Sequence, residues 1–205
     1  MSTEATTIET TEQKRGLKAW TTRDLLVTAV IGIVFAIIMA SVMNFGLVLW
    51  AAVTPLLAVA VFNGVFVMAG MTAPYIVRRP GAAILSELST GLAMSPFTSY
   101  GFGAIFGRLM EGVVYELPFL VTRYRRYDWL PMMLGGILGG TAFFLMSMAV
   151  YGAQNLATGF LIGLLLINTA SCALGVVLSR KLSHAIARSG VLSGFALSEE
   201  LQEEI

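Results

Sequence analysis

The hydrophobic residues of this chain fall into long, nearly uninterrupted runs, and the polar residues collect between them. Two of the clearest runs cover residues 130–149 and 160–178. A helix needs about 20 mostly apolar residues to cross the hydrocarbon core of a bilayer. Runs of this length and composition therefore predict membrane-spanning helices.

Six spans are predicted, separated by short polar turns. Thr22 and Asp24 favour the start of the first, because a hydroxyl can cap free amides and the helix dipole favours an anion there. Pro55 fits the first turn of the second span. The third is short because Ser95-Pro96 stops it. The predicted spans cover residues 24–43, 53–77, 82–94, 100–122, 129–150 and 156–182.

The basic residues predict how these spans are oriented. All but one of the 13 Lys and Arg residues precede the first span, lie in the last three residues of the sixth or after it, or lie in the second–third and fourth–fifth turns. With an even number of spans these positions share one side, and the positive-inside rule makes that side cytoplasmic. The chain is thus predicted to be an all-α, polytopic membrane protein of six transmembrane helices with both termini cytoplasmic. Its expected parts are a disordered tail (1–21), a membrane domain (22–182) and a C-terminal tail (183–205).

Composition supports this assignment and excludes several kinds of chemistry. The chain is 57% apolar and 12% charged, against about 45–50% and 25% in a typical globular domain. One cysteine and one histidine make neither a disulfide framework nor a transition-metal site. The phosphate-binding pattern GxxxxGK[ST] is absent from the sequence. We therefore expect no enzyme activity, no cofactor, no metal and no nucleic-acid partner.

Four charged residues interrupt the predicted spans: Glu87, Arg108, Glu111 and Glu116. A charge at bilayer depth is costly unless it faces a partner or a cavity, so such residues are functional candidates. Arg108 and Glu111 are three positions apart and can pair on one helix face. The four residues could form a structural ion-pair network, or a carboxylate could face a ligand. Three acids against one base favour the second interpretation and a cationic ligand.

Aromatic and amide side chains gather near the predicted outer ends of the spans. They fit an interfacial aromatic belt, and they also fit a capture site open to the outside, since rings stack on planar ligands and attract cations. The short third span would leave room for an outer vestibule. The candidate substrate-binding residues of this group are Asn44, Trp50, Tyr100, Tyr151 and Asn155, and Tyr115 joins them from the fourth span.

Small residues predict close helix contacts on two spans. Gly32, Ala36 and Ala40 repeat every four positions on the first span, and four glycines form overlapping GxxxG pairs on the fifth. Such stripes let helix backbones approach closely. Packing within the bundle explains them, and so does docking on another membrane subunit. The row on the first span is the better docking candidate.

The stretches MTAPYIVRRPGAAILSELSTGLA and GRLMEGVVYELPFLVTRYRRYDWLPMMLGGILGG resemble the YkoE family over residues 22–182. The most specific pieces are the RRPGAA turn before Glu87, the Glu116-Leu117 pair and the RYRR turn. This family comprises substrate-binding (S) components of energy-coupling factor (ECF) transporters. The resemblance implies a six-helix protein of the bacterial cell membrane that captures thiamine or its hydroxymethylpyrimidine moiety from outside. It also implies a transmembrane coupling subunit, two ABC ATPases, ligand contact by Glu87 and Glu116, and docking by Gly32, Ala36 and Ala40.

A second hypothesis is a stand-alone, ion-coupled secondary transporter of a small cationic or heterocyclic solute. Arg108, Glu111 and Glu116 would form its relay. The sequence shows no inverted repeat of the kind that many such transporters carry. A membrane enzyme or structural subunit is disfavoured because the chain offers no catalytic constellation.

Overall fold

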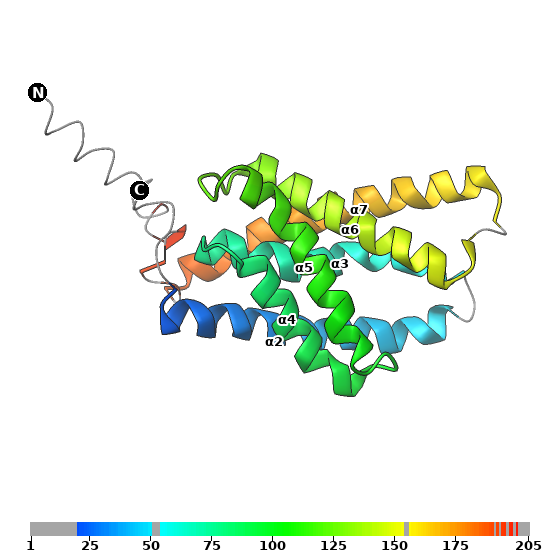
Figure 1. Ribbon diagram of the computed structural model, residues 1–205, viewed down its shortest axis with the longest axis horizontal. Coiled ribbons are helices and arrows are strands. Elements are labelled where there is room, and N and C mark those ends of the chain that lie inside the picture. The colour runs from blue at the N-terminus through cyan, green and yellow to red at the C-terminus, as the bar shows by residue number, and fades with distance from the viewer. Residues whose placement is uncertain are drawn as a thin grey trace, which may run out of the picture.

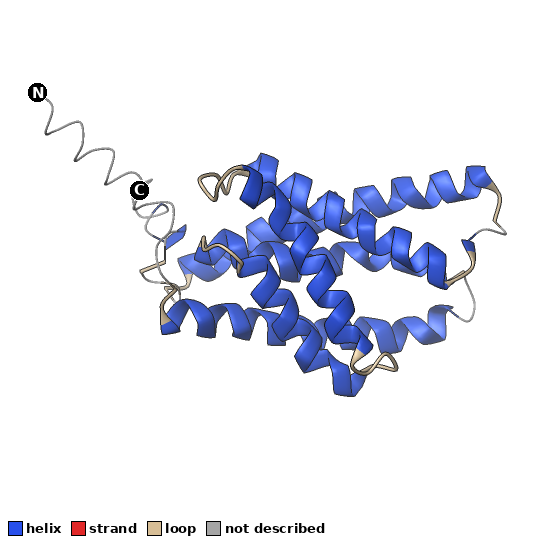
Figure 2. Cartoon of the chain, viewed as in Figure 1, coloured by secondary structure: helices blue, strands red, loops and turns tan. Residues whose placement is uncertain are grey.

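The computed structural model describes the backbone of residues 20–50, 54–153 and 156–190 and of positions 192, 194, 195, 197, 198 and 200, with side chains except at 47–50. The regular structure in these residues is helical (Figures 1 and 2), which confirms the predicted all-α class. The elements are α2 (Thr22–Trp50), α3 (Pro55–Val77), α4 (Ala82–Met94), the 3-10 helix η1 (Ser95–Phe97), α5 (Gly103–Val121), α6 (Trp129–Val150) and α7 (Thr158–Arg188).

The turn between α3 and α4 shows how local sequence sets the topology. Arg78 ends α3 in the left-handed region at φ 51°, and its amide donates to the carbonyl of Pro74 at 3.0 Å. Gly81 precedes α4 with φ 82°, a conformation that glycine adopts without steric cost. The indole of Trp20 donates to the carbonyl of Pro80 at 3.1 Å. The RRPG sequence thus reverses the chain and ties it to the segment before α2.

Alternation of the helices brings four chain segments to one end of the bundle. The start of α2, the α3–α4 turn, the α5–α6 loop and the end of α7 lie together on the left of Figure 1. We call this the basic end, because it carries Arg23, Arg78, Arg79, Arg126 and Arg188. The α4–α5 pair lies obliquely over the longer helices and turns back before reaching the opposite end (Figure 1). A cavity lies where this short pair turns back, lined in part by the end of α4 and the start of α5.

Helix α3 lies at the centre and its neighbours present apolar faces outward. Of the described helices, α2, α3, α6 and α7 are long and apolar enough to cross a membrane. In the most apolar stretch of α3, 72% is buried, against 28–33% for the other three. Their outer faces carry exposed side chains such as Leu26, Ile37, Leu138 and Leu166. Apolar surface of this extent is typical of contact with lipid.

The structure corrects the docking role expected of Gly32, Ala36 and Ala40. A Cβ at Gly32 would lie 2.5 Å from the carbonyl oxygen of Ser86, so α2 packs directly on α4 there. Ala36 is only 1% exposed and Ala40 only 7%. The row offers no free surface to another subunit, because the chain's own helices cover it. Of the two interpretations of this stripe, packing inside the bundle is the one the structure shows.

The C-terminal boundary expected at residue 182 is also corrected. Helix α7 continues to Arg188, since Ser183 and Ala187 keep a buried face in its last turns. Beyond it, Leu192, Phe195 and Leu197 are buried against the core at the basic end. Among the described positions after α7, the segment expected as a C-terminal tail packs on the bundle. Residues 1–19 of the expected N-terminal tail lie outside the described residues.

Candidate ligand cavity

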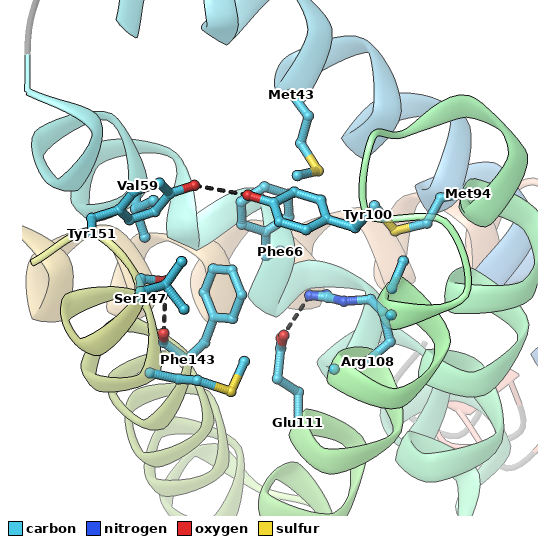
Figure 3. Close-up of a pocket in the computed structure, with 15 residues that line it drawn as sticks. Met43, Val59, Phe66, Met94, Tyr100, Arg108, Glu111, Phe143, Ser147 and Tyr151 are labelled. Atoms are coloured by element: carbon cyan, nitrogen blue, oxygen red, sulfur yellow. Dashed lines mark hydrogen bonds and ion pairs between the residues drawn. The ribbon is translucent and has the colours of Figure 1, made fainter.

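A cavity lies between α2, α3, α5 and α6 in the half of the bundle away from the basic end (Figure 3). Its volume is about 120 Å³, which by the same measure holds on the order of ten waters. This is room for a molecule of one or two rings. Apolar and aromatic side chains dominate the lining, including Met43, Phe66, Met94 and Phe143. Met94 at the end of the short α4 and Tyr100 in the loop after it belong to this lining.

Arg108 and Glu111 supply the charges of the cavity wall. Both are buried, and Nη2 of Arg108 donates to Oε2 of Glu111 at 2.6 Å. The guanidinium also lies 5.5 Å from the centre of the Phe66 ring, where the ring quadrupole attracts it. Tyr115 reaches the same Oε2 atom of Glu111 from 3.4 Å. Both of these contacts reach Oε2, and within the described residues no hydrogen bond reaches Oε1 of Glu111.

Glu87 stands behind Arg108 and does not line the cavity. It is 0% exposed, and its Oε2 atom lies 3.1 Å from Nη1 of Arg108. Neither carboxylate oxygen makes a well-aligned hydrogen bond with another described group. Gly70 makes space for this side chain, since a Cβ there would lie 2.9 Å from Oε1 of Glu87. Arg108 therefore bridges a fully buried carboxylate and a cavity-lining one.

Tyr115 fixes the position of this cluster. Its fully buried ring fits between two glycines, because a Cβ at Gly70 or Gly139 would lie 2.3 Å or 2.1 Å from the ring. Gly139 belongs to the overlapping GxxxG pairs of the sequence, so one glycine of that stripe accommodates a side chain of α5. Tyr115 does not line the cavity. It contacts Glu111 from within the buried core.

Glu116, one of the two first candidates for ligand contact, does not line the cavity. Its Oε1 and Oε2 atoms accept the amides of Gly81 at 2.6 Å and Ala83 at 3.0 Å. These are free donors at the start of α4, where Gly81 has no side chain to cap them. Burial and, to a smaller extent, the Glu116 carboxylate raise the pKa of Tyr124, in the loop after α5, to about 12. Glu116 thus caps α4 at the basic end.

The two tyrosines expected at the outer ends both line the cavity. Figure 3 shows them on the side opposite Arg108 and Glu111, and the hydroxyls of Tyr100 and Tyr151 lie 2.7 Å apart. Asn44 is exposed and does not line the cavity; its amide donates to the carbonyl of Phe97 at 3.2 Å and ties α2 to η1. The side chain of Trp50 and the whole of Asn155 lie outside the described residues.

A family model described as "ABC-type cobalt transport system, permease component" matches residues 23–142. The YkoE protein of Bacillus subtilis (strain 168), whose name describes an HMP/thiamine permease protein, is 30% identical over 190 residues. The match covers 92% of this chain and 95% of that protein. The chain belongs to the YkoE family.

A solved structure of an S-component of an ECF transporter matches with a TM-score of 0.82 at 29% identity, over 91% of this chain and 95% of the other.

This YkoE-family chain is a multi-pass protein of the bacterial plasma membrane. Its cavity is lined in part by residues that the sequence did not single out. Phe66 and Phe143 pack edge to face with ring centres 5.7 Å apart, and Met43, Met94 and Ser147 complete the wall near them. An apolar residue in an apolar helix carries no sign of whether it faces lipid, core or cavity. The described part of the chain contains no group of three or more His, Cys, Asp or Glu side chains suited to a metal ion.

Proposed function

We propose that this YkoE-family chain is the substrate-binding S component of an ECF vitamin importer, and that it captures thiamine or its hydroxymethylpyrimidine moiety from outside the cell. The observation that carries this proposal is the aromatic cavity with Glu111 and Arg108 in its wall. The likeness of fold to an S-component supports the same conclusion.

In the proposed topology all the helices α2–α7 belong to a six-helix membrane domain, with both termini in the cytoplasm. The gathering of basic residues at one end supports it, because Lys and Arg are retained on the cytoplasmic side. Helix α4 has 13 residues and spans roughly 20 Å at 1.5 Å per residue, too short to cross alone. Helices α4 and α5 enter the membrane together from the basic end and turn back before the opposite end (Figure 1), and in this topology the cavity opens to the exterior.

The cavity chemistry fits a flat, cationic or amine-bearing heterocycle. Oε1 of Glu111 accepts a hydrogen bond from an aminopyrimidine or faces a thiazolium charge, and a hydrogen bond to a charged group contributes about 1.5–3 kcal/mol. Phe66 and Phe143 provide ring contacts, and the tyrosines close the outer side. Glu87 acts through Arg108, which it holds beside Glu111.

The proposed partners are a transmembrane coupling subunit and two ABC ATPases, which supply the energy for release into the cell. The chain itself binds and presents the vitamin without catalysis. The secondary-transporter alternative loses support because its relay is interrupted. Glu116 bonds to backbone amides at the basic end, while Arg108 and Glu111 pair deeper in the bundle.

Calorimetry on the purified protein tests the proposal with thiamine and its hydroxymethylpyrimidine moiety as ligands. We expect at least one to bind with Kd below about 10 μM, which corresponds to about 6.8 kcal/mol. Failure of both contradicts the proposal. A second assay uses proteoliposomes that contain this chain alone. Thiamine uptake driven by an ion gradient without ATPases would favour the secondary transporter instead.

A further inference from the structure

The cluster of Glu87, Arg108 and Glu111 has two carboxylates and one guanidinium. Nη2 of Arg108 faces Glu111 at 2.6 Å, and Nη1 faces Glu87 at 3.1 Å. All three side chains are at least 94% buried. If both carboxylates are ionised, one negative charge is in excess. An uncompensated buried ion costs several kcal/mol, so this arrangement needs a further positive charge or a proton.

The surrounding helices do not supply that positive charge. Helices α3 and α6 contain no charged residue in their sequences, and Glu87 is the only one in α4. The charged residues of α2 and α7 within the described ranges lie at the basic end. The titratable groups packed near the cluster are Tyr115 of α5 and Cys172 of α7. Neither of these side chains carries a positive charge in any protonation state.

We infer that Glu87 and Glu111 share one proton in the ligand-free protein, and that a cationic ligand entering beside Glu111 releases that proton. This rests on the proposed function, because it deepens the role of the same cavity. The O–H bond of the carboxylic acid breaks, its electron pair stays on the carboxylate, and the proton passes to water in the cavity. Arg108 then balances Glu87 while the ligand cation balances Glu111. The cluster is charge-balanced before and after binding.

The position of the three residues gives the proton its route. Glu87 is sealed from the cavity, whereas Arg108 and Glu111 line it. The proton is therefore released from the carboxyl group of Glu111, which faces the cavity. A ligand without a positive charge cannot replace the proton, because losing the proton would leave one carboxylate uncompensated. Such a ligand therefore binds while the cluster keeps its proton. The pair of carboxylates thus distinguishes a thiazolium-bearing molecule from its neutral pyrimidine half.

Calorimetry in buffers of different ionisation enthalpy counts the protons exchanged on binding. Thiamine is expected to release close to one proton per molecule bound, and the hydroxymethylpyrimidine moiety none. By linkage, the Kd for thiamine should fall by up to about tenfold for each unit by which the pH rises, over the range in which the ligand-free protein holds the proton. Glu87→Gln, which mimics the protonated acid, should abolish the release, and Glu116→Gln should keep it. Thiamine binding without proton release at every pH between roughly 5 and 8 overturns the inference.

Infrared spectroscopy of the ligand-free protein tests the shared proton without any vitamin. At neutral pH we expect a protonated-carboxyl band that weakens or disappears in Glu87→Gln or Glu111→Gln and persists in Glu116→Gln. A spectrum in which neither of the first two variants removes such a band overturns the inference even if thiamine binds. Conversely, if neither thiamine nor its hydroxymethylpyrimidine moiety binds, the proposed function is contradicted. The infrared band still shows whether Glu87 and Glu111 hold a proton.

Discussion

Helix α5 carries two glutamates five positions apart, and the structure gives them unrelated roles. Glu111 lies in the cavity wall and meets other side chains, Arg108 and Tyr115. Glu116 lies near the basic end, where its carboxylate accepts hydrogen bonds from the backbone amides of Gly81 and Ala83. The comparison teaches that residue type and helix do not define a ligand contact in a membrane protein. What a carboxylate faces decides its role.

The two glutamates also differ in how many of their carboxylate oxygens already accept hydrogen bonds from the protein. Both oxygens of Glu116 accept backbone hydrogen bonds at the start of α4, where the helix dipole favours a negative charge. Glu111 meets its described partners through Oε2 alone. Glu116 therefore has little left to offer a ligand, whereas Glu111 keeps one oxygen for it. Four substitutions would break or sharpen this contrast.

The largest effect is expected for Arg108→Met, which leaves Glu87 and Glu111 without their cation. Removing one partner of a buried ion pair costs about 3–5 kcal/mol, seen as a lower free energy of unfolding in detergent. Adding Glu87→Gln should recover part of that loss. The matched control is Arg126→Met, because Arg126 is 61% exposed and pairs with the exposed Asp128. Such a surface pair contributes at most about 1 kcal/mol. Equal losses in the two variants would contradict the described cluster.

The next effect concerns binding, and it compares the two glutamates directly. Glu111→Gln is expected to weaken thiamine binding by about 10- to 150-fold, the equivalent of about 1.5–3 kcal/mol for a charged hydrogen bond. Glu116→Gln should change the Kd by less than about threefold, since it acts on helix capping alone. Calorimetry on both variants gives the two values. A larger loss in Glu116→Gln than in Glu111→Gln would reverse the assignment made from the cavity.

A substitution behind the cavity tests how Tyr115 supports Glu111. Gly139→Ala places a methyl group 2.1 Å from the Tyr115 ring, and overpacking of this kind costs about 1–3 kcal/mol. The free energy of unfolding should fall accordingly. Gly163→Ala in α7 is the control, because a Cβ there meets no atom within 4 Å. Unchanged stability in Gly139→Ala would show that Tyr115 is not wedged as described.

The smallest effect is expected at the pair of tyrosines that lies across the cavity from Arg108 and Glu111. Tyr100→Phe removes the hydroxyl that pairs with Tyr151, and a net hydrogen bond is worth about 0.5–1.5 kcal/mol. We expect thiamine to dissociate about three- to tenfold faster in stopped-flow measurements. Tyr127→Phe is a suitable control, since within the described residues the Tyr127 hydroxyl has no hydrogen-bond partner. Identical dissociation rates for Tyr100→Phe and the unaltered protein would rule out this closure.

The sequence by itself determined the helices, the gathering of basic turns at one end and the presence of costly charges at Glu87, Arg108 and Glu111. These follow from hydropathy, turn residues and charge, which act locally along the chain. Only the tertiary structure decided that Glu116 caps α4, that Ala36 is buried and that Phe66 and Phe143 face a cavity. Each of these depends on how a helix is rotated about its axis and which distant helix covers it. In a chain that is apolar on nearly all sides, helix rotation leaves little trace in the sequence, so packing alone sets which residues meet.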